Sequence, residues 1–197
     1  MDNFIKIKKS NDEIMKTITA NCFNMLRERK LKDAPDDEIK KYYETLKNKF
    51  VFSVDLTNPD RDNIKTYEIY YFNQFNGMNS SVINETMKQK DGIHKIIIVD
   101  DIVFSNLKEN NKYVELFKTS ELMLNLVDFK YCPKVQMLKE DEIKQLLKDY
   151  NISKKQLPQF EKKDPLVRYY NGRKGDIFKI IRYSPVSGTA IAYRSVV

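Results

Sequence analysis

Glycine, cysteine, histidine and tryptophan are scarce or absent in this chain of 197 residues. Five glycines leave no G-x-G-x-x-G or P-loop motif, so no segment is suited to cradling a nucleotide phosphate. Cys22 and Cys132 are too few for a disulfide framework or for a zinc site of their own. His94 is the only histidine, which excludes histidine-rich metal sites. We therefore expect no metal and no cofactor.

Long hydrophobic runs are also missing. The most apolar segment, Ile96–Val99, ends at Asp100 and Asp101, whereas a membrane helix needs about 20 apolar residues. The first residues show no signal-peptide pattern. Apolar residues make up 41% of the chain and aromatic residues 12%, which is enough to form a core. The composition predicts a globular protein of a reducing compartment, with no membrane association.

Charge is distributed unevenly along the chain. The formal net charge is +7. Residues 1–132 hold equal numbers of acidic and basic side chains, so the whole excess lies in residues 133–197. This asymmetry predicts two domains, 1–132 and 133–197, with different roles. A basic surface on the second domain suits either nucleic acid or an acidic protein partner.

Hydrophobic periodicity predicts that the first domain is an α/β domain with a mixed sheet. Helices are expected to begin near Ser10, Asp36 or Asp37, Ser81 and Ser105, and the first of these starts with the capping-box spacing of Ser10 and Glu13. Cys22 falls on the apolar face of that helix and is interpreted as a core residue. The predicted strands are Phe50–Val54, Thr66–Phe72, His94–Val99 and Glu121–Asp128.

The second domain is predicted to be a small α+β unit, which makes the whole chain α+β. A helix is expected over Lys139–Tyr150, with Tyr150 among its inward residues. Asp164 and Pro165 have the pattern of a cap and first-turn proline, and Asn171-Gly172 would end that short helix. Two strands are predicted around a tight connection: Asp176–Tyr183 and Thr189–Val196.

Enzyme hypotheses find little support in these residues. A metal-dependent nuclease needs two acids and a lysine around a small sheet. Asp60, Asp100 and Asp101 suit the acids, but Glu68 is followed two positions later by a tyrosine and not by a lysine. His94 adjoins a buried-looking strand, which disfavours a catalytic role.

Residues 168–182 alternate basic and aromatic side chains. Such a segment can neutralise phosphates and stack on bases, and it can equally be a half-buried strand or a face that docks acidic protein. These alternatives stay open on sequence physics alone. The side chains concerned are Arg168, Tyr169, Tyr170, Arg173, Lys174, Phe178, Lys179 and Arg182.

Several short motifs in order resemble one family. They are Gln156-Leu157-Pro158, Asp164–Tyr169, Arg173–Arg182, Ser187-Gly188 and Tyr193-Arg194. Together they resemble the fifth subunit shared by eukaryotic nuclear RNA polymerases and its shorter archaeal counterpart. The likeness covers roughly residues 133–197. The chain departs from it at Asn171-Gly172, where Gly-Leu is expected, and at Pro185 and Thr189 in the hairpin.

The resemblance implies a non-catalytic subunit of a multisubunit DNA-directed RNA polymerase. The second domain is then an assembly domain that packs on the largest subunit, and the first is a jaw-like domain beside downstream duplex DNA. It implies no catalytic residue, no metal and no small-molecule substrate. Residues expected at the subunit interface are Asp164, Pro165, Arg168, Tyr169, Arg173, Lys174, Lys179, Arg182, Tyr193 and Arg194.

The location and one alternative function follow from the same reasoning. The protein is expected in the nucleus if it is cellular, and in the host cytoplasm or virion if it comes from a large DNA virus. Many Lys, Asn, Ile and Tyr residues, which have A/T-rich codons, suit such a virus or another A/T-rich lineage. The alternative is a free-standing basic nucleic-acid-binding protein.

Overall fold

The chain folds into two compact units, Met1–Leu124 and Asn125–Val197. The computed structural model describes residues 10–72, 80–88, 92–100, 107, 111–128, 132–184 and 188–197. Each unit has its own four-stranded sheet. The boundary that the sequence predicts, after Cys132, lies within the second unit. Of the helices in the described ranges, none has both the length and the apolar character needed to cross a membrane.

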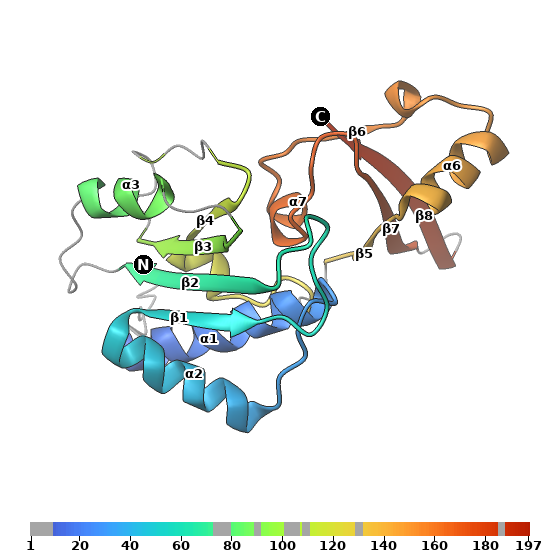
Figure 1. Ribbon diagram of the computed structural model, residues 1–197. Helices are drawn as coiled ribbons and strands as arrows, with labels where there is room; N and C mark the ends of the chain where they lie inside the picture. Colours follow the sequence, from blue (N-terminus) through green and yellow to red (C-terminus); the bar gives the residue numbers. More distant parts are fainter. Residues whose placement is uncertain are drawn as a thin grey trace, which may run out of the picture. The chain divides into compact units, whose positions relative to one another are not determined.

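The first unit is a mixed sheet between helices, as the sequence predicts. Strand order is β1-β2-β3-β4, with β1 and β2 antiparallel and the other neighbours parallel. Helices α1 and α2 lie on one face of this sheet and α3 on the other (Figure 1). The elements are α1 (Asn11–Glu28), α2 (Asp36–Lys49), β1 (Val51–Asp55), β2 (Thr66–Phe72), α3 (Ser80–Lys88), β3 (His94–Val99), β4 (Val114–Lys118) and α5 (Thr119–Leu122).

Local signals set the starts of the first two helices. The capping box is confirmed, because the Ser10 amide donates to the Glu13 carboxylate at 2.9 Å and the Glu13 amide donates to the Ser10 hydroxyl at 3.3 Å. Helix α2 instead follows Pro35, and Asp36 is its first residue, where its charge suits the positive end of the helix. Cys22 is fully buried, and burial raises the pKa of its thiol to about 12, so it is the core residue that the sequence predicts.

The predicted strand Glu121–Asp128 is wrong. The last strand of the sheet is β4, after which the chain turns through α5, and Leu124 is 66% exposed. Glu115 interrupts the apolar pattern of β4 and is nevertheless buried. The helix expected after Ser105 falls largely outside the described residues.

A buried polar cluster explains how the sheet accommodates Glu115. Arg29, at the end of α1, donates to both carboxylate oxygens of Glu115 at 2.8 and 2.6 Å. His94 Nε2 donates to the same carboxylate at 2.6 Å, and the Tyr67 ring stacks on His94 with centroids 4.3 Å apart. Burial raises the pKa of the Glu115 carboxyl, but the charge of Arg29 and the hydrogen bonds from His94 and Arg29 outweigh it and lower that pKa to about 2. The cluster joins α1 to β2, β3 and β4.

The second unit is a sheet of strand order β5-β7-β8-β6. Antiparallel pairing joins β5 to β7 and β7 to β8, and the short β6 runs parallel to β8. Both predicted strands of the hairpin are confirmed. The elements are β5 (Lys134–Met137), α6 (Glu140–Asp149), a 3₁₀ turn (Lys154–Gln156), β6 (Gln159–Phe160), α7 (Pro165–Tyr169), β7 (Ile177–Ser184) and β8 (Gly188–Val196).

Replacing the buried carboxylate tests the polar cluster. We expect Glu115→Gln to lower the free energy of unfolding by about 3 kcal/mol, because the buried Arg29 side chain loses the negative charge to which it donates two hydrogen bonds. Urea unfolding followed by circular dichroism measures this. Asp141→Asn is the control, because the Asp141 side chain is 99% exposed and its ion pair with Lys144 is long, at 4.0 Å. Equal unfolding midpoints for the two variants would contradict a stabilising cluster.

The cluster also predicts a pH dependence. The folded pKa of Glu115, about 2, lies below its ordinary value of 4.5. Its stabilisation is therefore complete above the ordinary pKa and is lost as the pH falls from about 5 towards 2. Thermal unfolding over this range should show a steeper loss of stability in the natural chain than in Glu115→Gln. Parallel curves would show that another carboxylate controls the acid response.

Candidate protein-interaction surface

The β7–β8 hairpin sorts the predicted interface residues onto two faces. The two strands pair antiparallel along the whole of β7. Successive side chains point to opposite faces and paired residues share a face. Lys179 and Tyr193, which are opposite each other, lie on one face, and Arg182 and Arg194 lie on the other. The predicted residues therefore do not form one continuous surface.

Helix α6 covers only part of the first face. Ile143 of α6 packs with Ile177 in a core cluster, and Tyr193 packs against that cluster. The same face continues along the hairpin to Ile191, which is 53% exposed, and Tyr183, which is 82% exposed. Large apolar side chains therefore meet solvent where the hairpin extends beyond the cluster.

Tyr150 extends this exposed surface. The sequence predicts an inward Tyr150, which is wrong: the side chain is 63% exposed and lies edge-on to Tyr193, with centroids 6.2 Å apart. Lys134 and Lys179, which pair with Ile181 and Tyr193, add positive charge to the same face. The hairpin patch consists of Tyr150, Ile181, Tyr183, Ile191 and Tyr193.

Helix α7 covers the opposite face. The Tyr170 ring, just after α7, lies 6.1 Å from the buried Phe178 ring, and Phe160 meets Phe178 edge-on at 5.9 Å. Arg194 is exposed, with its guanidinium 5.3 Å from the Phe160 ring centre. Arg182 is also exposed on this face. Both arginines are accessible cations on this face.

The start of α7 has the predicted cap. The Asp164 carboxylate accepts a hydrogen bond from the Leu166 amide at 2.9 Å, and Pro165 is the first helical residue. Tyr169 is only 2% exposed, so its side chain belongs to the core of the unit, and Arg168 is partly buried. Of these, Pro165 is the exposed residue, and an interface role for the segment stays a prediction.

The turn before β7 holds the remaining two predicted residues. The Arg173 amide donates to the Asp176 carboxylate at 2.7 Å, and Gly175 follows with a φ of 91°, which favours glycine. Lys174 is exposed and lines an open pocket together with Lys154 and Lys155.

Sequence reasoning misses several accessible side chains. It interprets Tyr183 and Ile191 only as strand residues, although the alternation of the hairpin puts both on the face of Tyr193. Exposure along a strand depends on how far the covering helix reaches, and the sequence does not show the end of that cover. Lys154 and Lys155 precede the Gln156-Leu157-Pro158 motif, but no pattern in the sequence distinguishes them from other surface lysines.

Two of the three acids considered for a nuclease, Asp60 and Asp100, have structural partners. Asp60 accepts hydrogen bonds from the Ile64 amide at 3.0 Å and the Tyr67 hydroxyl at 3.0 Å. Asp100 accepts one from the Thr119 hydroxyl at 3.1 Å, and Asp101 lies outside the described residues. Within the described ranges, no group of three His, Cys, Asp or Glu residues is placed to hold a metal.

Comparison with known proteins points to one class. The family described as "RNA polymerase Rpb5, C-terminal domain" matches residues 124–196. "DNA-directed RNA polymerase subunit 5" of Acanthamoeba polyphaga mimivirus is 29% identical over 208 residues, covering 99% of this chain and 98% of the viral protein. "DNA-directed RNA polymerase subunit Rpo5" of Methanocaldococcus jannaschii is 35% identical over 74 residues, 38% of this chain and 95% of the archaeal protein.

A cellular eukaryotic relative agrees with both. "DNA-directed RNA polymerases I, II, and III subunit RPABC1" of Caenorhabditis elegans is 32% identical over 121 residues, 58% of this chain and 57% of the nematode protein. These relatives define the class as subunits of DNA-directed RNA polymerases. The chain belongs to the Rpb5 family of RNA polymerase subunits, as the motifs in its sequence indicate.

Gly172 offers a test of how tightly α7 packs on Phe178 of the sheet. A Cβ at this position would lie 2.8 Å from Val167 Cγ1 and 2.9 Å from Phe178 Cε2, and Asn171, with a φ of 51°, already takes the left-handed position that ends the helix. We expect Gly172→Ala to destabilise the second unit by roughly 1–3 kcal/mol through overpacking. Thermal unfolding measures this, with the exposed Lys162→Ala as control. An unchanged midpoint would show that α7 packs loosely on Phe178.

Proposed function

We propose that this chain is a non-catalytic subunit of a multisubunit DNA-directed RNA polymerase, and that its second unit docks on the largest subunit. The observation that carries the docking proposal is the hairpin patch. Tyr183 and Ile191 stand exposed on the unit that the Rpb5 family matches. Exposed apolar clusters of this kind mark protein-protein contact sites.

The lengths of the relatives support an assembly role for the second unit. The archaeal relative aligns over nearly its whole length with 38% of this chain, so it has the size of one unit and not of two. A polymerase subunit of that size has no room for a further large domain. The function that this chain shares with its short archaeal relative is therefore best assigned to the second unit, which the family description matches.

Charge indicates the chemistry of the docking partner. Residues 133–197 carry the net charge of +7. Lys134 and Lys179 flank the hairpin patch, and the exposed Arg182 and Arg194 lie on the opposite face. Arginine binds carboxylates through two parallel hydrogen bonds, so a partner surface with acidic residues around an apolar centre fits this unit.

The first unit is proposed to lie beside downstream DNA in the assembled enzyme. The mimivirus relative matches the chain at full length, which includes this unit. Because residues 1–132 are neutral in sum, the contact with DNA should be weak and local, with affinity supplied by the rest of the enzyme. The viral relative favours the host cytoplasm or virion over the nucleus as the site of function.

Disrupting the hairpin patch tests docking. We expect Tyr183→Ser combined with Ile191→Ser to reduce recovery of the largest polymerase subunit by at least about tenfold, since each buried apolar side chain contributes roughly 1.5–3 kcal/mol. Co-purification on the tagged full chain from its native source measures this. Leu124→Ser is the matched control, because it removes an exposed apolar side chain from the first unit.

Two results would contradict the proposal. Recovery of the largest subunit equal to that of the control would remove the hairpin patch as the docking site, provided that circular dichroism shows a folded double variant. Recovery of no polymerase subunit by the natural chain, together with tight and strongly salt-dependent binding of duplex DNA by the free chain, would favour a free-standing nucleic-acid-binding protein.

A further inference from the structure

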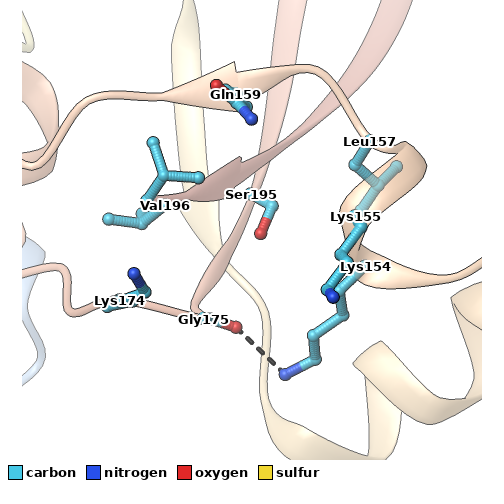
Figure 2. Close-up of a pocket in the computed structure, with 9 residues that line it drawn as sticks. Lys154, Lys155, Leu157, Gln159, Lys174, Gly175, Ser195 and Val196 are labelled. Atoms are coloured by element: carbon cyan, nitrogen blue, oxygen red, sulfur yellow. Dashed lines mark hydrogen bonds between the residues drawn. The ribbon is translucent and has the colours of Figure 1, made fainter.

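An open pocket of about 420 Å³ lies in the second unit. It is formed where the 3₁₀ turn, the turn before β7 and the end of β8 meet (Figure 2). Leu157 and Val196, which are 8% and 1% exposed, provide an apolar floor. Of the interface residues predicted from the sequence, Lys174 alone is among the described residues that line this pocket.

The rim of the pocket is positive. Lys154, Lys155 and Lys174 line it, and all three are exposed. The Lys154 ammonium donates to the Gly175 carbonyl at 3.0 Å, which holds it at the pocket edge and leaves two of its three N–H donors for another acceptor. In the ranges that the structure describes, no carboxylate forms an ion pair with any of these lysines.

Ser195 adds a hydroxyl to this setting. The residue is 6% exposed, and its backbone is held by the Pro158 carbonyl, which accepts from the Ser195 amide at 2.9 Å. Figure 2 shows the hydroxyl directed toward the edge formed by Lys154 and Gly175. Among the described residues, no hydrogen-bond partner is found for this hydroxyl. The hydroxyl is therefore a hydrogen-bond donor that a ligand in the pocket can use.

The combination selects a small anion attached to an apolar group. The lysines and the serine supply donors, so the ligand must accept hydrogen bonds and carry negative charge. The apolar floor disfavours a free, fully hydrated anion such as inorganic phosphate. Its oxygens would lose hydrogen bonds to water against Leu157 and Val196, which offer none in return. A carboxylate next to an apolar side chain satisfies both parts of the pocket.

We propose that this pocket binds an acidic residue flanked by apolar residues, in a peptide segment of another polymerase subunit. The carboxylate accepts from the Ser195 hydroxyl and the Lys154 ammonium, and the neighbouring apolar side chain lies on Leu157 and Val196. This inference rests on the proposed function for the source of the peptide. Peptide binding itself is a property of the isolated full chain and is measured without the polymerase.

The experiment titrates the full-length chain with the peptide N-acetyl-Leu-Asp-Leu-amide and follows the amide resonances of Gly175 and Ser195 by NMR. We expect saturable shifts with a dissociation constant of about 1 mM, the range for a short flexible ligand. The neutral analogue N-acetyl-Leu-Asn-Leu-amide should bind at least about tenfold more weakly, because its amide lacks the charge that the lysines attract.

Variants assign the binding to the named groups. Ser195→Ala should weaken binding of the acidic peptide roughly tenfold, as expected for one hydrogen bond to a charged acceptor. Lys154→Gln should weaken it several-fold and reduce its salt dependence. Lys162→Gln is the matched control, because Lys162 is exposed in the same unit and does not line the pocket.

Several outcomes would overturn the proposal. These are equal binding of the acidic and neutral peptides, binding unchanged by both pocket variants, or no shifts at peptide concentrations about tenfold above the expected constant. Inorganic phosphate binding as tightly as the acidic peptide would replace the carboxylate site by a general anion site. Peptide binding without recovery of polymerase would overturn the assembly role alone, and recovery without peptide binding would overturn the pocket alone.

Discussion

The antiparallel pairing of β7 with β8 is the constraint on which the functional unit depends. Once the register is set, every side chain of the hairpin has an assigned face. One face packs under α6 and the other under α7, and each helix covers only part of its face. The exposed remainder, and the pocket near the end of β8, are surfaces that this arrangement leaves accessible to solvent.

A different constraint organises the first unit. Arg29 and Glu115 are far apart in sequence and form a buried, doubly hydrogen-bonded ion pair. This pair lets a charged residue occupy a buried position in β4 and connects α1 to the sheet. Asp60 and Asp100 likewise hold loops and strand ends through hydrogen bonds. These two acids, which suggested nuclease chemistry, thus have structural partners.

Membership of the Rpb5 family changes how the uneven charge of the chain is interpreted. A positive second unit beside a neutral first unit suggests nucleic-acid binding when only the totals are considered. The structure divides the positive charge into three groups. Lys134 and Lys179 lie on the sheet face that α6 covers, and Arg182 and Arg194 lie on the face that α7 covers. The third group is the lysines at the pocket rim. Three separate groups of cations, each beside apolar surface, suit contacts with acidic protein segments better than one continuous track for a phosphate backbone.

Much of this protein follows from local sequence alone. The capping box at Ser10, the cap at Asp164, the fully buried strand β3 and both strands of the hairpin were predictable, because neighbouring residues determine them. The motifs of residues 156–194 identified the family for the same reason. The strand β4 was not predictable, since Glu115 is tolerated there only through Arg29, a partner distant in the chain. The exposure of Tyr150, Tyr183 and Ile191 was decided by tertiary structure, because burial depends on what packs above a residue and not on its neighbours in sequence. Tertiary structure also decided that Ser195 and Lys154 line one pocket.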